Sequence, residues 1–150
     1  MHDVILLPTD GSDEGHRAVQ YAFELAHIHE ARIEALHVVN IASYGGLPTE
    51  RAWDGVTAAL HDEGTAIIEE IIEMAPSAVA VEGTVREGSP GRVIPRFAEA
   101  VEADLIVMGT HGRGGIERVL LGSVAERVVR TADVPVVTVP ITADRSLRLA

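Results

Sequence analysis

The sequence contains no cysteine and no lysine, and only 3% of its residues are aromatic. Without cysteine, the chain cannot form disulfides, thiolate metal sites or a cysteine nucleophile. No apolar run approaches the roughly 18 residues that cross a membrane. The first residues, 1–3 (MHD), also lack the basic segment that opens a secretion signal. We therefore expect a soluble, cytoplasmic protein that spans no membrane.

The charge of the chain is strongly one-sided. Its 12 basic residues are all arginine, and 23 acidic residues bring the net charge to −11. Such a field opposes general binding to nucleic acid or to an anionic membrane surface. The composition resembles that of acidic proteins from salt-loving organisms, and an ordinary acidic cytosolic protein is the alternative. The length of 150 residues with 47% hydrophobic content predicts one folded domain.

Apolar runs alternate with helical periodicity along the chain. The patterns predict strands near residues 3–9, 32–40, 78–85, 104–108 and 134–139, with helices near 14–29, 52–74, 89–101 and 124–130. Alternating strands and helices favour right-handed crossovers, a mostly parallel sheet and helices on both of its faces. In such sheets, ligands bind beyond the carboxyl ends of strands where the strand order reverses.

A glycine-rich segment follows the fourth predicted strand. The apolar run 105–108 (LIVM) stops at Gly109, Gly112 follows in the loop, and Gly122 with Ser123 opens the next predicted helix. Glycines let a backbone approach a phosphate closely, and the unpaired N–H groups at a helix start point toward it. The order of strand, loop and helix start therefore indicates a phosphate-bearing ligand.

Several side chains near this segment allow two interpretations. Asp10, at the end of the first predicted strand, is either a turn or cap aspartate or a ligand contact at the expected reversal point. Ser123 can cap its helix and bind phosphate with the same N–H groups. His111 either approaches a phosphate or fills the loop, and His37 is interpreted as a buried, hydrogen-bonded histidine.

Known catalytic motifs are missing from the chain. There is no P-loop lysine motif, no dinucleotide fingerprint after the first strand and no nucleophile elbow. No general base stands beside an evident nucleophile. The absence of these motifs favours a binding module over an enzyme.

Three segments together resemble the universal stress protein family. Gly109-x2-Gly112-x9-Gly122-Ser123 is similar to the family motif G-x2-G-x9-G-[ST], which marks its ATP-binding subgroup. The first strand ending at residues 8–12 (PTDGS) and the segment 36–38 (LHV) resemble two further family signatures. The likeness runs from residue 3 to about residue 140.

The resemblance implies a complete architecture. It predicts a single-domain α/β fold, an open five-stranded parallel sheet in the order 3-2-1-4-5 with helices on both faces. This fold is Rossmann-like and similar to the adenine nucleotide alpha hydrolases. Residues 1–140 would form the universal stress protein domain, and residues 141–150 a polar C-terminal tail.

The resemblance also implies an ATP site with Mg²⁺. Asp10 would organise the ribose and the metal ion, and Val38 would meet adenine through its backbone. The implied nucleotide-binding residues are Pro8, Thr9, Asp10, Val38, Met108, Gly109, Gly112, Arg113, Gly122, Ser123 and Val124. A homodimer would form through the fifth strand, Val134 to Val139.

The function expected from this resemblance is a nucleotide-dependent regulatory or sensor module in stress response. Two alternatives remain open. One is a slow ATPase or autophosphorylating protein. The other is a dimeric interaction protein that works without nucleotide.

Overall fold

The computed structural model describes residues 2–45, 49–111 and 121–140. In chain order its elements are β1 (Val4–Pro8), η1 (Asp13–Gly15), α1 (His16–His29), β2 (Arg32–Val39), η2 (Ile41–Tyr44), α2 (Glu50–Met74), β3 (Val81–Glu87), α3 (Pro90–Ala100), β4 (Leu105–Gly109), α4 (Ser123–Thr131) and β5 (Val136–Val139). The strands form one sheet in the order β3-β2-β1-β4-β5, and every neighbouring pair is parallel. The predicted strand order is confirmed.

Two predicted strands begin later in the structure than the sequence pattern indicated. The third strand occupies residues 81–87, not 78–85. The residues just before this strand form a turn, in which the Val79 N–H donates to the Pro76 carbonyl at 2.9 Å. The fifth strand begins at Val136, two residues after the predicted start at Val134. In both cases the apolar run includes residues that lead into the strand.

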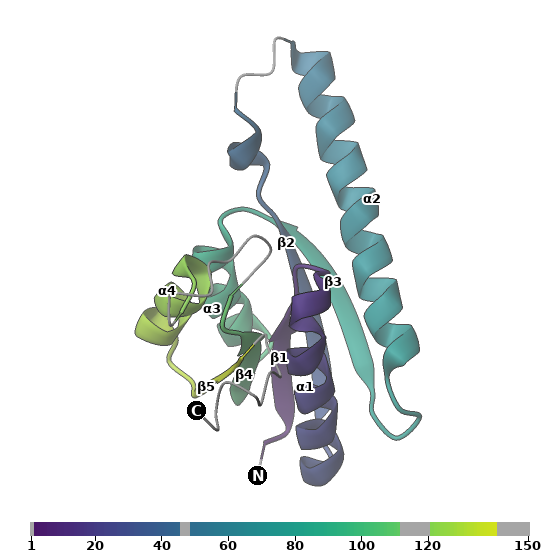
Figure 1. Cartoon of the computed structure of the whole chain (residues 1–150), viewed down its shortest axis with the longest axis vertical. Coiled ribbons are helices and arrows are strands. Elements are labelled where there is room, and N and C mark those ends of the chain that lie inside the picture. Colours follow the sequence, from purple (N-terminus) through teal and green to yellow (C-terminus); the bar gives the residue numbers. More distant parts are fainter. Residues whose placement is uncertain (1, 46–48, 112–120, 141–150) are drawn as a thin grey trace, which may run out of the picture.

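Helices cover both faces of the sheet, as the alternating pattern predicted (Figure 1). Strand side chains alternate between the faces, so odd and even positions enter different cores. Ile5 and Ile33 pack in the core that contains residues of α1 and α2, such as Val19 and Ile68. A second core, beneath α3 and α4, contains Leu6, Leu36, Ile94, Phe97, Ile106 and Val128.

Helix α2 is the longest element, with 25 residues. Its first turns extend past the carboxyl end of the sheet (Figure 1). The Thr49 side chain caps it by accepting a hydrogen bond from the Ala52 N–H at 3.1 Å. Gly64 does not interrupt the helix, which is continuous from Glu50 to Met74. Gly64 is buried because the helix approaches the sheet closely at that point.

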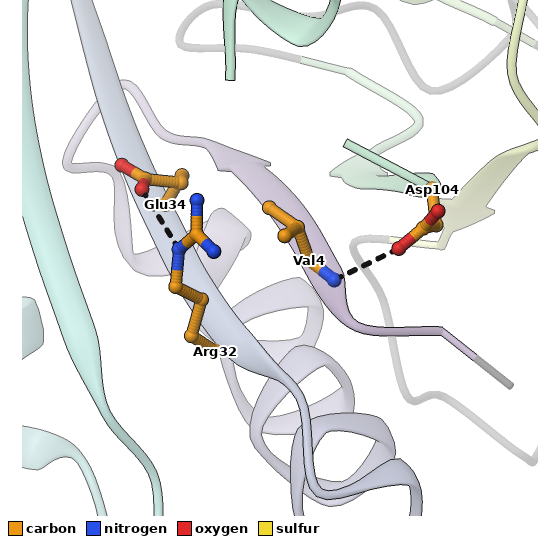
Figure 2. Close-up of polar contacts among 4 residues, drawn as sticks. All are labelled: Val4, Arg32, Glu34 and Asp104. Carbon is orange, nitrogen blue, oxygen red and sulfur yellow. Dashed lines mark hydrogen bonds and ion pairs between the residues drawn. The ribbon is translucent and has the colours of Figure 1, made fainter. Parts of the chain in front are cut away.

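Two polar contacts near the start of β1 and β2 are drawn in Figure 2. Asp104, just before β4, accepts hydrogen bonds through Oδ2 from the N–H groups of Asp3, at 2.8 Å, and Val4, at 3.0 Å. On β2, the buried Glu34 accepts a hydrogen bond from Nε of Arg32 at 3.2 Å. The two carboxylates therefore accept hydrogen bonds from backbone N–H groups and from an arginine near the first residues of β1 and β2.

The hydrogen bonds from Val4 and then Asp3 hold the pKa of the Asp104 carboxyl below its ordinary value of 3.8. A carboxylate with a depressed pKa stabilises the folded protein above 3.8, and this stabilisation is lost as the pH falls through the folded-state pKa. We expect Asp104→Asn to be less stable than wild type at neutral pH, with a difference that shrinks in acid. Urea unfolding of both proteins at neutral pH and below pH 3.8 measures this. A difference independent of pH would contradict it.

Candidate functional site

The carboxyl end of β1 separates from β4. The two strands pair at only two positions, both in the first half of the β1–β4 overlap. The Val4 carbonyl accepts from the Asp104 N–H at 2.9 Å, so even-numbered residues of β1 direct their backbone groups toward β4. Pro8 has this orientation but carries no N–H, so it cannot continue the ladder. A gap therefore opens between the ends of these strands.

β1 also separates from β2. The Thr9 N–H donates to the Leu36 carbonyl at 2.9 Å, and in a regular parallel ladder the Thr9 carbonyl would next accept from the N–H of Val38. Nδ1 of His37 instead lies 2.9 Å from that carbonyl. Among the described residues, no backbone hydrogen bond joins Thr9 to Val38. The backbone of Val38 therefore faces the space that β1 has left.

This double separation produces a cavity of about 580 Å³, which lies within the range of about 300–1,000 Å³ typical of small-molecule sites. The structure brings these nine predicted site residues to its wall: Pro8, Thr9, Asp10, Val38, Met108, Gly109, Gly122, Ser123 and Val124. The remaining two, Gly112 and Arg113, lie outside the described residues.

The glycine-rich side of the cavity joins β4 to α4. The Gly122 N–H donates to the Thr110 carbonyl at 2.7 Å, and Thr110 in turn donates to the Val139 carbonyl of β5 at 2.9 Å. Gly122 is the N-cap residue of α4, and Ser123 is its exposed first residue. The prediction that Ser123 caps the helix is therefore wrong by one position. The N–H groups of the first turn of α4, which have no acceptor within the helix, border the cavity, where they suit an anion.

Asp10 both shapes a turn and lines the cavity. Its Oδ1 accepts hydrogen bonds from the Ser12 N–H at 2.9 Å and from the Ser12 hydroxyl at 2.6 Å. Gly11, between them, has a φ of +78°, a conformation that favours glycine. The turn interpretation of Asp10 is confirmed, and its contact with a ligand stays a prediction. Within the described ranges, no three His, Asp or Glu side chains come together as a metal site.

The cavity also includes residues that motif reasoning did not identify. Leu60 and Glu63 come from α2, Ser43 from η2, and Pro90 and Ile94 from α3. They belong to helices whose placement depends on packing, so no local motif marked them. The extension of α2 past the sheet brings its residues over the strand ends (Figure 1).

Two histidines contribute to the same wall. His37 is half-buried on β2, and its hydrogen bond to Thr9 agrees with the predicted bonded histidine. His111 is buried, and its Nδ1 lies 3.1 Å from the Thr110 hydroxyl. His111 also lines the cavity.

The chain that forms this cavity is similar to a known protein family. A model described as the universal stress protein family matches residues 1–140. The chain belongs to the universal stress protein family. Universal stress protein MJ0531 of Methanocaldococcus jannaschii is 41% identical over 140 residues, which covers 93% of this chain and 82% of the relative.

Solved structures of similar proteins have the same fold. The hypothetical protein MJ0577 superposes with a TM-score of 0.82 at 28% identity, covering 93% of this chain and 96% of the other. A universal stress protein in complex with cAMP gives a TM-score of 0.70 at 26% identity, covering 94% and 98%. The described part of this universal stress protein contains no helix with the length and apolarity that a membrane crossing requires.

Proposed function

We propose that this universal stress protein binds ATP in the cavity and acts as a nucleotide-dependent regulatory or sensor module. One observation carries the proposal: β1 leaves both neighbouring strands, and predicted nucleotide-binding residues from β1, β2, β4 and α4 line the resulting space. The relative crystallised with cAMP supports an adenine nucleotide as the ligand class.

The two sides of the cavity suit the two ends of a nucleotide. Val38, Ile94 and Met108 form an apolar wall against which a base can pack, and the backbone of Val38 offers it polar partners. Gly109, Gly122 and the first turn of α4 would receive the phosphates through backbone N–H groups. By the family resemblance, Gly112 and Arg113 would join them.

Asp10 would bind Mg²⁺ together with the nucleotide. Its carboxylate lies at the end of β1, and carboxylate oxygens suit this ion. Mg²⁺ usually keeps several waters and binds through one or two carboxylates plus substrate phosphates. Asp10 and Glu63 are the two carboxylates of the described cavity wall, and so few carboxylates fit an ion that arrives with ATP better than a separate resident metal.

Calorimetric titration of the purified protein with ATP, in the presence and absence of Mg²⁺, tests this proposal. We expect ATP to bind, to bind more tightly with Mg²⁺, and to bind more tightly than GTP. Folding is monitored in parallel by circular dichroism. A folded protein that takes up no ATP under either condition would show the proposal to be wrong.

We also propose a homodimer through the outer edge of β5. The Pro135 and Val139 carbonyls accept from β4 and from Thr110, so the backbone groups of odd-numbered residues face inward. Thr138 therefore directs its N–H to the outer edge of the sheet. Thr138→Pro removes this N–H without removing a bond to β4. We expect it to sediment as a folded monomer, whereas Thr138→Val, which keeps the N–H, stays dimeric. A wild-type monomer, or a dimeric proline variant, would exclude this interface.

A further inference from the structure

The imidazole of His37 makes a hydrogen bond to the backbone of the neighbouring strand. His37 lies on β2 and is half-buried, with Nδ1 2.9 Å from the Thr9 carbonyl oxygen. A carbonyl can only accept a hydrogen bond, so Nδ1 must carry the proton and donate. A side chain of β2 thus makes the bond that a backbone N–H of β2 would make in a regular ladder.

This hydrogen bond changes the backbone partners of Val38, the next residue of β2. On β2, even-numbered residues direct their backbone groups toward β1: the Arg32 N–H donates to Asp3 at 3.0 Å, and the Leu36 carbonyl accepts from Thr9 at 2.9 Å. Val38 has the same orientation. With the Thr9 carbonyl occupied by the ring, the Val38 N–H is left directed into the cavity, which Val38 lines.

Helix α2 holds the ring in this position from the other side. A Cβ atom added at Gly64 would lie 2.8 Å from Cδ2 of His37 and 3.1 Å from Cγ1 of Val85. Only glycine lets the helix pass this close to the ring. The imidazole is therefore confined between the α2 backbone and the end of β1.

We propose that His37 is a positioning residue for recognition of the nucleobase. By occupying the Thr9 carbonyl, it keeps the Val38 N–H available to a base edge. The Val38 carbonyl lies beside it, because the Gly11 N–H that would continue the ladder donates to Thr9 Oγ1 at 3.2 Å. The inference rests on the proposed nucleotide function. An adenine edge offers a ring-nitrogen acceptor and an exocyclic amino donor, which match a backbone N–H and C=O. Guanine presents a ring N–H and a carbonyl at the corresponding positions, which oppose the same pair.

Two substitutions of similar shape separate the hydrogen bond from packing. His37→Leu keeps a branched side chain but has no donor, whereas His37→Asn can place an amide N–H near the position of Nδ1. We expect His37→Leu to lower ATP affinity by about tenfold and to reduce the preference for ATP over GTP, while inorganic tripolyphosphate binds as to wild type. His37→Asn should recover most of the affinity and the preference. An unchanged ATP-to-GTP ratio in His37→Leu would overturn the proposal.

A measurement without nucleotide tests the same role independently. In the ligand-free wild type, we expect the Val38 amide hydrogen to exchange much faster than that of Leu36. In His37→Leu, the released Thr9 carbonyl should pair with Val38 and slow its exchange. If wild type binds no ATP but this exchange pattern holds, the proposed function fails while the strand-opening role of His37 stands. Equal protection of Val38 and Leu36 in wild type would refute that role.

Two glycine-to-alanine changes in α2 test the contribution of the helix. Gly64→Ala would push on the ring, whereas a Cβ at Gly55 meets nothing within 4 Å. Both changes improve helix propensity. We expect Gly64→Ala to weaken ATP binding severalfold and Gly55→Ala to leave it unchanged. Wild-type ATP affinity in Gly64→Ala would show that α2 does not hold the ring.

Discussion

Gly122→Val is expected to lower the affinity for ATP by about a hundredfold, which corresponds to about 2.7 kcal/mol of binding free energy. A Cβ at this position already lies 3.3 Å from the Thr110 carbonyl oxygen and 3.4 Å from Cα of His111. Both are backbone atoms, which yield less easily than the end of a side chain. The branched valine would therefore displace the backbone of Thr110 and His111 and cover the N–H groups at the start of α4. Calorimetric titration with ATP measures the loss.

Gly55→Val is the matched control, because a Cβ atom added at Gly55 meets no atom within 4 Å. We expect it to bind ATP like wild type. Circular dichroism and thermal unfolding of both variants show whether the fold survives. Equal ATP affinity for wild type and a folded Gly122→Val variant would remove Gly122 from the proposed site.

Gly83→Ala is expected to lower the free energy of unfolding by about 1–3 kcal/mol, the usual cost of overpacking a core. Gly83 lies in β3, where α2 packs against the sheet. A Cβ there would lie 1.9 Å from Cγ2 of Ile68, a buried core residue of α2. The strand and the helix can coexist with alanine only if one of them moves. Urea unfolding of wild type and variant measures the difference.

Second substitutions at Ile68 identify the atom responsible. Leucine lacks the Cγ2 methyl group on Cβ, whereas valine keeps both γ carbons. In the Gly83→Ala background, we therefore expect Ile68→Leu to recover part of the lost stability and Ile68→Val to recover none. The single variants at Ile68 provide the reference for this double-mutant cycle. Additive effects in both pairs would mean that the cost at Gly83 arises elsewhere.

The alternation of apolar runs predicted the layers of the fold because each strand and helix has its own local periodicity. The strand ends of the cavity were predictable for a related reason. Once the strand order is known, parallel strands that flank its reversal must bring their carboxyl ends together, as Asp10 and Gly109 do. Local sequence therefore identified the strand ends and glycines that line the cavity.

The helical side of the cavity could not be predicted in this way. Leu60 and Glu63 reach the cavity only because α2 extends past the sheet and packs closely at Gly64. The sequence pattern indicated a long helix but not its position over the strand ends. The role of His37 was hidden for a similar reason, since its bond to Thr9 depends on where β1 stops following β2.

The cavity wall is assembled from both halves of the chain, with contributions from β1, β2, η2, α2, α3, β4 and α4. Such a site exists only in the folded protein, so a ligand that binds there stabilises the whole domain by an amount set by its concentration relative to its dissociation constant. At a concentration a hundred times its dissociation constant, it contributes about 2.7 kcal/mol. The lifetime of this protein against unfolding and proteolysis would then follow the supply of nucleotide in the cell.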